Sequence, residues 1–131
     1  NNFGNIVNIA SDLAVIAPNQ SIYRSDSGDC DSSYDRKKPI SYSVIKHGLL
    51  GLTKYMATYY CDRNVRCNAL SPGGVQTDQP DEFINKLEAL VPLGRMARPS
   101  EYKGAIKFLC SDASAYMNGQ NVIIDGGRSV W

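Results

Sequence analysis

The sequence lacks several features that would place it in common functional classes. Its four cysteines form no C-x-x-C pair and it has one histidine, His47, so it offers no set of ligands with the spacing of a zinc site. No apolar run approaches the roughly 18 residues that a membrane span needs. A formal net charge of +1 provides no overall field for nucleic acid or an anionic membrane. We therefore expect no metal, no nucleic acid and no membrane partner, and reduced thiols in a cytoplasmic protein.

Two further absences concern the ends and the glycines of the chain. The sequence does not begin with Met, and its first residues show no basic segment followed by an apolar one, as a signal peptide would. Its 11 glycines include no G-x-G-x-x-G turn of the kind that binds a dinucleotide phosphate. The length of 131 residues fits one domain.

The apolar pattern predicts strands that alternate with helices. Short, β-branched segments at 5–10, 65–70 and 121–125 are typical of buried strands. Helices are expected at 41–62 with Ser41 as N-cap, at about 80–90, and from Pro99 to Cys110. This alternation predicts an α/β fold with a parallel sheet, whose ligands bind at the carboxyl ends of the strands. Ser11, residues 71–77 and the start of the 41–62 helix all fall at that edge.

The segment 41–62 has the clearest helical pattern. Gly48 and Gly51 interrupt it and cost helix stability, so we expect another backbone to approach the helix closely there. His47 is expected on the helix surface or in helix packing. The apolar residues that recur at steps of three and four are Ile45, Leu49, Leu52, Met56 and Tyr59.

Two Tyr-x-x-x-Lys pairs occur in the chain, Tyr34 with Lys38 and Tyr42 with Lys46. A phenol has a pKa of about 10, and a lysine one helical turn away favours its ionised form. Pro39 disfavours helical dihedrals at Lys38, so the first pair is not expected to share a helix face. Tyr42 opens the predicted helix and Lys46 follows one turn later. Taken locally, sheet packing for Tyr42 and solvation for Lys46 remain open alternatives.

Five blocks in a fixed order carry a family resemblance. They are GNIVNIAS at 4–11, YSVIK at 42–46, NVRCNALSPG at 64–73, LGR at 93–95 and SDASAYMNGQNVIIDGG at 111–127. Together they closely resemble the C-terminal half of the short-chain dehydrogenase/reductase family. The resemblance implies the C-terminal part of a Rossmann-like, doubly wound parallel sheet, with three strands, two main helices and a short one. Residues 1–131 would form the catalytic half of a single domain, with an inserted loop at about 19–39.

The resemblance also implies catalytic roles. Tyr42 would be the general acid/base as a hydride moves between a substrate carbon and the nicotinamide. Lys46 would lower the pKa of Tyr42 and hold the ribose of the nicotinamide. Ser11 would hydrogen-bond the substrate oxygen and orient it.

A further segment of the resemblance implies cofactor binding, to NAD or NADP alike. Pro72, Gly73, Val75 and Thr77 match the segment that touches the nicotinamide end, with Tyr42 and Lys46 beside it. Backbone groups of Val75 would meet the carboxamide, and Thr77 would lie near the pyrophosphate. An ordinary strand-to-helix turn is the plainer interpretation of residues 72–74 on their own.

The expected function is that of an NAD(P)-dependent oxidoreductase acting on a small alcohol or ketone. Family members commonly form a homodimer or homotetramer through the tyrosine-bearing helix and the last strand. A weaker similarity to members from bacterial cell-surface glycan pathways, at 17–39 and 78–81, adds a sugar derivative as a substrate class. A nucleotide-sugar epimerase or dehydratase is one alternative, and an inactive fragment or oligomerisation module is another.

The chain departs from the family pattern in two ways. It has no glycine-rich turn, so the N-terminal nucleotide-binding half is expected to be absent and the 131 residues alone to be an inactive fragment. The strand at 5–10 would then have an unpaired edge. In addition, Ser11 and Tyr42 are farther apart than is usual in the family, because of an insertion at about 21–39. That insertion is expected to be a substrate lid or a mobile surface loop.

Overall fold

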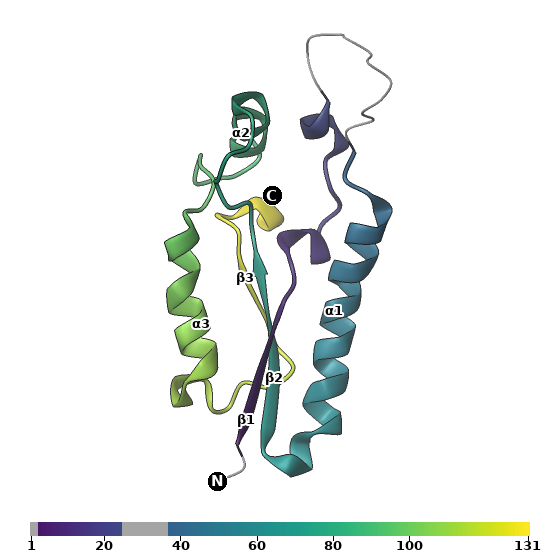
Figure 1. The fold of residues 1–131 in the computed structure, drawn as a ribbon, viewed down its shortest axis with the longest axis vertical. Coiled ribbons are helices and arrows are strands. Elements are labelled where there is room, and N and C mark those ends of the chain that lie inside the picture. The colour runs from purple at the N-terminus through teal and green to yellow at the C-terminus, as the bar shows by residue number, and fades with distance from the viewer. Residues whose placement is uncertain (1–2, 25–36) are drawn as a thin grey trace.

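Three parallel strands form the centre of the molecule. The structure, a computed structural model, describes residues 3–24 and 37–131 (Figure 1). Strands β1 (Gly4–Ile9), β2 (Val65–Pro72) and β3 (Asn121–Ile124) lie in the order β1-β2-β3. Both pairings are parallel, so the carboxyl ends of all three strands lie at one edge of the sheet. The predicted Rossmann-like α/β sheet is confirmed.

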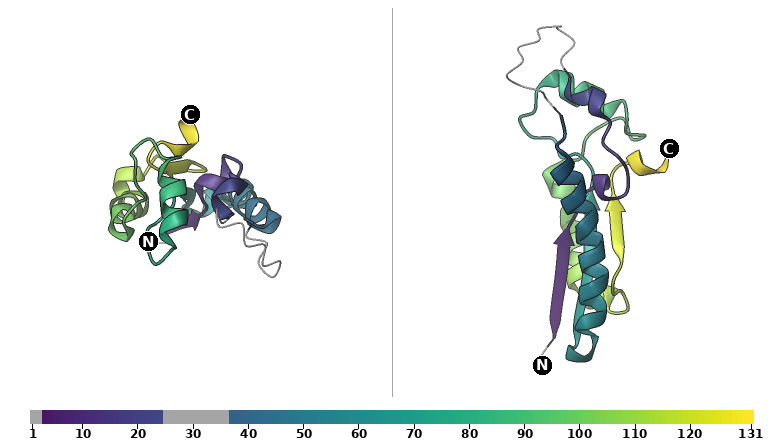
Figure 2. Two further views of the ribbon diagram at one scale, coloured as in Figure 1. Left: turned by 90° about the horizontal axis from the view of Figure 1, so that it is seen from above. Right: turned by 90° about the vertical axis from the view of Figure 1, so that its right-hand side faces the viewer.

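Helices cover both faces of this sheet. The helices α1 (Ile40–Tyr59) and α3 (Lys103–Cys110) lie on opposite faces, as the views in Figures 1 and 2 agree. The short helix α2 (Asp81–Glu88) lies beyond the carboxyl edge. A 3-10 turn at Pro99–Tyr102 precedes α3, so the segment predicted as one helix has a tighter first turn. In the part of the chain that the structure describes, no helix is long and apolar enough to cross a membrane.

Helix α1 begins at Ile40, and its N-cap lies two residues before the expected one. Its N-cap is Pro39, with φ −66° and ψ 146°, and no side chain caps the helix. The prediction of Ser41 as N-cap is therefore wrong, because the extended conformation of Pro39 lets the helix start at the next residue. The helix ends at Tyr59 rather than near 62, and Asn64 turns the chain into β2 with a left-handed φ of 54°.

The face of α1 that packs on the sheet is not the apolar one that the sequence pattern emphasises. Thr53 and Ala57, 1% and 3% exposed, face the sheet. Thr53 also accepts a hydrogen bond of 2.9 Å from the Asn8 side chain of β1. The expected close approach at Gly48 and Gly51 is wrong within the described residues, because a Cβ at either position would meet no atom within 4 Å. Instead, α1 presents a row of exposed apolar side chains: Val44, Ile45, Leu52, Tyr55 and Tyr59.

The core of the sheet follows β2. Residues 66–71 of β2 are buried, whereas β1 is only partly covered and its Ile9 is 47% exposed. The expectation that residues 5–10 form a buried strand is therefore wrong, because β1 pairs on one side alone in the described sheet. Residues 25–36, which hold Tyr34 and most of the expected insertion, lie outside the described residues. The lid expected for this segment has no structural description.

Candidate active site

A cavity of about 320 Å³ opens at the carboxyl ends of the strands. Ser11, Tyr42 and Lys46 all line it, together with the turn at 72–75 that follows β2. The three segments that the sequence placed at this edge therefore converge on one hollow. Thr77 is not among the lining residues; it is exposed, and its N–H donates to Gln79 Oε1 at 2.8 Å. Its role near a pyrophosphate stays a prediction.

Tyr42 and Lys46 occupy consecutive turns at the start of α1. The Lys46 ammonium donates a hydrogen bond of 2.9 Å to the carbonyl of Ile9, the last residue of β1. Its Nζ lies 5.6 Å from the centroid of the Tyr42 ring. Among the described residues, the Tyr42 hydroxyl has no hydrogen-bond partner. The phenol is thus available to a ligand, with a cation held beside it.

Ser11 stands directly after β1 and is 5% exposed. It caps the 3-10 turn Asp12–Ala14, where its hydroxyl accepts a 3.2 Å hydrogen bond from the Leu13 N–H. The same hydroxyl donates to Asp12 Oδ1 at 2.9 Å. Both contacts fix the position of Oγ, while the donated proton can turn to a stronger acceptor in the cavity.

Asp12 and Arg128 form a buried ion pair in the wall of the cavity. Arg128 Nη1 donates to Asp12 Oδ2 at 2.8 Å, and the two side chains are 7% and 4% exposed. Arg128 reaches this place because Gly126 and Gly127 turn the chain back after β3, both with a positive φ. The sequence prediction missed both charged residues. The signal was their position, one directly after Ser11 and the other directly after the glycine pair that closes the last strand.

Lys38 is a further residue that the sequence prediction passed over. Its Nζ lies 3.8 Å from the centroid of the Tyr42 ring and 5.9 Å from that of Tyr23. Burial lowers the pKa of Lys38; Asp12 counteracts this, and the cations Arg128 and Lys46 lower the pKa further. Lys38 precedes α1, and its ammonium reaches the Tyr42 ring from outside the helix.

The turn at 72–75, which follows β2, is closely packed on the side that faces away from the main cavity. Gly73 donates its N–H to the Ile124 carbonyl at 2.9 Å, and a Cβ on Gly73 would lie 2.7 Å from the Cα of Asp125. A Cβ on Gly74 would lie 2.6 Å from a methyl of Leu87 in α2. At Gly73 the contact is with backbone, so only glycine allows this approach, whereas at Gly74 the contact is with the end of the Leu87 side chain. The turn is thus packed against the end of β3 on one side and α2 on the other.

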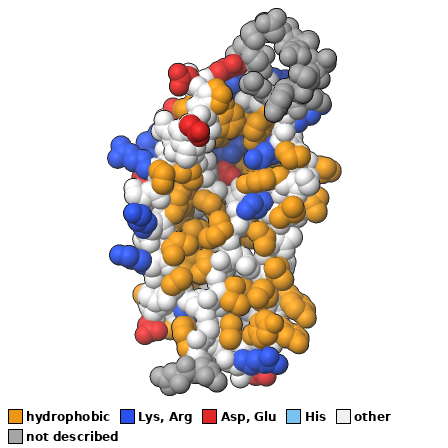
Figure 3. Space-filling view, in the orientation of Figure 1, with side chains coloured by type: hydrophobic (Ala, Val, Ile, Leu, Met, Phe, Trp, Pro, Cys, Tyr) orange, Lys and Arg blue, Asp and Glu red, His pale blue; other side chains and the backbone are white. Residues whose placement is uncertain are grey.

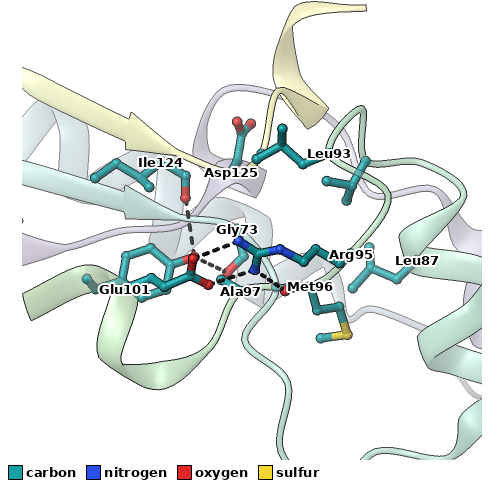
Figure 4. Close-up of a pocket in the computed structure, with 13 residues that line it drawn as sticks. Gly73, Leu87, Leu93, Arg95, Met96, Ala97, Glu101, Ile124 and Asp125 are labelled. Atoms are coloured by element: carbon teal, nitrogen blue, oxygen red, sulfur yellow. Dashed lines mark hydrogen bonds and ion pairs between the residues drawn. The ribbon is translucent and has the colours of Figure 1, made fainter.

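A second, smaller pocket of about 80 Å³ lies behind the same turn (Figure 4). The Tyr102 hydroxyl reaches the carbonyls of Gly73 and Ile124 at 3.4 and 3.3 Å. Arg95 points toward Glu101 and donates two hydrogen bonds of 2.7 Å to its carboxylate. These bonds hold the pKa of Glu101 at about 2. The pocket is thus a support for the turn at 72–75, whose other side faces the main cavity.

A parallel α/β sheet that brings a serine, a tyrosine and a lysine to its carboxyl edge defines a Rossmann-like protein with its site at the usual edge. Comparisons with known proteins agree with this fold class. The sequence profile of a family described as enoyl-(acyl carrier protein) reductase matches residues 1–129. The chain belongs to the short-chain dehydrogenase/reductase family. A 3-oxoacyl-(acyl-carrier-protein) reductase FabG of Aquifex aeolicus is 37% identical over 92 residues, which cover 67% of this chain and 37% of the relative.

Two other relatives cover more of the chain. The D-threitol dehydrogenase of Mycolicibacterium smegmatis is 33% identical over 97% of this chain and 44% of its own. The crystal structure of a short-chain dehydrogenase from Leptospira borgpetersenii with bound NAD+ superposes with a TM-score of 0.83 at 36% identity, over 97% of this chain and 45% of that one. The chain thus spans less than half the length of these relatives.

Proposed function

We propose that this chain carries the catalytic part of an NAD(P)-dependent oxidoreductase, which moves a hydride between nicotinamide and an alcohol or ketone. The observation that carries the proposal is the single cavity that Ser11, Tyr42, Lys46 and the turn at 72–75 line together. Family membership supports it. So do the NAD+ bound to the Leptospira relative and the NADP bound to a gluconate 5-dehydrogenase from Burkholderia cenocepacia, which is 27% identical with a TM-score of 0.80.

The donors in the cavity fit the nicotinamide end of such a cofactor. Lys46 uses one ammonium proton on Ile9 and keeps two for ribose hydroxyls. The Ala97 N–H donates to the Gly74 carbonyl, and the Gln76 N–H donates to the Ala97 carbonyl. The Val75 N–H has no backbone acceptor among the described residues and is available to a carboxamide. When bound, the nicotinamide supplies the two-electron carrier. We assign only this end to the chain, because its sequence holds no glycine-rich phosphate turn.

The side chains that line the cavity have different roles in proton transfer. In the oxidation of an alcohol, Tyr42 accepts the hydroxyl proton as general base. Ser11 turns its proton from Asp12 to the substrate oxygen. Asp12 tolerates this loss because its carboxylate keeps the Leu13 N–H at 2.8 Å and the Arg128 guanidinium. In the reduction of a ketone, Tyr42 returns the proton.

The substitution Tyr42→Phe tests the proposal. It keeps the ring over Lys38 and removes the proton carrier, so the rate of nicotinamide reduction should fall by roughly 100- to 10,000-fold with the fold intact. The control is Tyr116→Phe, at a fully exposed tyrosine far along the chain from the cavity-lining residues. Both variants are made in the longest form that the gene encodes and assayed by absorbance of reduced nicotinamide with alcohols, polyols and sugar derivatives.

Three outcomes would contradict the proposal. Equal activity of the Tyr42→Phe variant and the wild type would remove Tyr42 as acid/base. Conversion of a nucleotide sugar with no net change in nicotinamide would favour an epimerase or dehydratase. Failure to bind either NADH or NADPH, as measured by nicotinamide fluorescence, would favour an oligomerisation module without catalysis. Among substrates, the relatives named for D-threitol and gluconate support a sugar derivative.

The outer face of α1 supports a second proposal, a homodimer or homotetramer. Hydrophobic side chains gather over α1 in Figure 3, and Val44, Leu52 and Tyr55 are 44–64% exposed there. A contiguous apolar face of this kind is typical of an interaction surface. Leu52→Glu should dissociate the assembly in sedimentation experiments, whereas the same change at the exposed Lys54 should not. An unchanged mass for the Leu52→Glu variant would contradict this use of the face.

A further inference from the structure

Positive charges outnumber negative charges among the side chains that line the cavity. Three of them are cations, Lys38, Lys46 and Arg128, and Asp12 is the single acid among the lining residues. Asp12 is already committed, since Arg128 holds its Oδ2 and groups of its own turn hold Oδ1. Lys46 is bonded to the Ile9 carbonyl, which is neutral. The cavity therefore carries positive charge that no carboxylate of its lining balances.

Lys38 has the least satisfied of these charges. Between residues 3–24 and 37–131, its ammonium finds no hydrogen-bond acceptor and no carboxylate in salt-bridge range. It contacts only the ring faces of Tyr42 and Tyr23, at 3.8 and 5.9 Å from their centroids. Aromatic faces attract a cation but accept none of the strong hydrogen bonds that an ammonium can donate. Partial burial has removed water from this cation and lowers the pKa of Lys38 accordingly.

The backbone at Lys38 is held on both sides. The Gln20 side chain donates to the Lys38 carbonyl at 3.1 Å, and the Lys38 N–H donates back to Gln20 Oε1 at 2.9 Å. Pro39, the residue that follows Lys38, is itself extended, and α1 begins directly after it. A surface lysine needs no such clamp. This one is held where its ammonium lies over the proposed acid/base.

From these contacts we infer that Lys38 binds an anionic group of the substrate, a carboxylate or a phosphate, while Tyr42 and Ser11 act on a hydroxyl or carbonyl of the same molecule. The inference rests on the proposed function, because it names the substrate class of that site. The cavity volume of about 320 Å³ suits a small molecule. The anionic group takes no part in the redox step: the carbinol carbon loses a hydride to the oxidised nicotinamide, its hydroxyl loses a proton to Tyr42, and a hydroxy acid becomes an oxo acid.

The test compares pairs of small ketones that differ in the charged group. Acetoacetate and acetoacetamide probe a carboxylate, and dihydroxyacetone phosphate and dihydroxyacetone probe a phosphate. Binding is measured by calorimetry in the presence of the oxidised dinucleotide, so that no ketone is reduced. The variants are Lys38→Met, Lys38→Arg and, as a matched control, Lys107→Met at an exposed lysine of α3.

We expect the wild type to bind the charged member of one pair more tightly, and the pair that shows this identifies the group. Lys38→Met should reduce that preference by about 10- to 100-fold and leave the neutral member unchanged, since one charged hydrogen bond is lost. Lys38→Arg and Lys107→Met should keep it. Equal binding of charged and neutral members by the wild type would overturn the inference. An equal loss for both members in Lys38→Met would also overturn it and make Lys38 a positioning residue for Tyr42.

Turnover separates this inference from the proposed function. A protein that reduces the neutral ketones with NADH or NADPH but shows no charge preference refutes the inference alone. A protein with a Lys38-dependent preference that turns over neither these pairs nor the alcohols, polyols and sugar derivatives of the first assay has the anion site at Lys38 but contradicts the oxidoreductase proposal.

Discussion

The ion pair between Asp12 and Arg128 allows a quantitative test of how the cavity wall is held. Arg128→Met removes one partner and keeps much of the side-chain volume. Breaking a buried pair by removing one partner costs about 3–5 kcal/mol, because a charge stays buried without its counterion. Here the Asp12 carboxylate keeps the Leu13 N–H and the Ser11 hydroxyl on Oδ1. We therefore expect the low end, about 3 kcal/mol, which is more than a hundredfold in the folding equilibrium.

Urea unfolding of Arg128→Met, Asp12→Asn and the double variant measures this cost as a thermodynamic cycle. Each single variant should lose stability, and the double variant should lose less than the sum of the two, because it leaves no unpaired charge. The matched control is Arg95→Met, which breaks an ion pair of similar length whose side chains are 45% and 37% exposed. Its loss should be small, since water solvates the Glu101 carboxylate that remains.

Two results would refute this reasoning. One is a wild-type unfolding midpoint for Arg128→Met, which would mean that water or rearrangement compensates the buried carboxylate fully. The other is a double variant that loses the full sum of the single losses, which would mean that the two side chains stabilise the fold independently. Either result would remove the ion pair as the element that holds the chain after β3 against the Ser11 turn.

Two further predictions concern the glycines and the exposed ion pair. Gly73→Ala should lower the free energy of unfolding by about 1–3 kcal/mol, because its Cβ would lie 2.7 Å from the Asp125 Cα. Gly51→Ala, in open space on α1, should raise the free energy of unfolding by about 0.5–1 kcal/mol. Thermal unfolding checks both, and a loss of stability in Gly51→Ala would contradict an uncovered helix face. Arg95 lowers the pKa of Glu101 from 4.5 to about 2. The carboxylate should therefore stay ionised, and keep its stabilising effect, as pH falls past 4.5. The charge and the stabilising effect should both be lost as pH falls through about 2. A carboxyl NMR titration checks this, and an unchanged value in Arg95→Met would contradict the assigned cause.

The parts of the fold that follow from local pattern were predictable. Alternating strands and helices and the position of Tyr42 and Lys46 on consecutive turns of one helix need only the order and spacing of residues. The details that failed depend on neighbours. Whether residues 5–10 are buried depends on what covers β1, and which face of α1 meets the sheet depends on the fit of Thr53 and Ala57, which are small rather than strongly apolar.

The cavity residues that the sequence prediction missed share one physical reason. Lys38 was set aside because Pro39 excludes it from the helix, and it is indeed outside the helix. Its place over the Tyr42 ring depends on a side-chain clamp from Gln20, which no local spacing reveals. Arg128 meets Asp12 across 116 positions of sequence, a contact that only the folded sheet creates.

Because Lys46 is hydrogen-bonded to the Ile9 carbonyl, the geometry of the site depends on how β1 pairs with β2. Ile9 is the last residue of β1, and its register opposite Leu70 sets where that carbonyl lies. A slip of β1 by one residue would move this carbonyl along the strand and point it to the opposite side of β1, which would leave the ammonium without its anchor. Under the proposed function, fraying of β1 would therefore inactivate the site while α1, β2 and β3 stay folded. Loss of activity on gentle heating or dilute denaturant would then precede the main unfolding transition, and its midpoint would measure the stability of one strand rather than of the whole molecule.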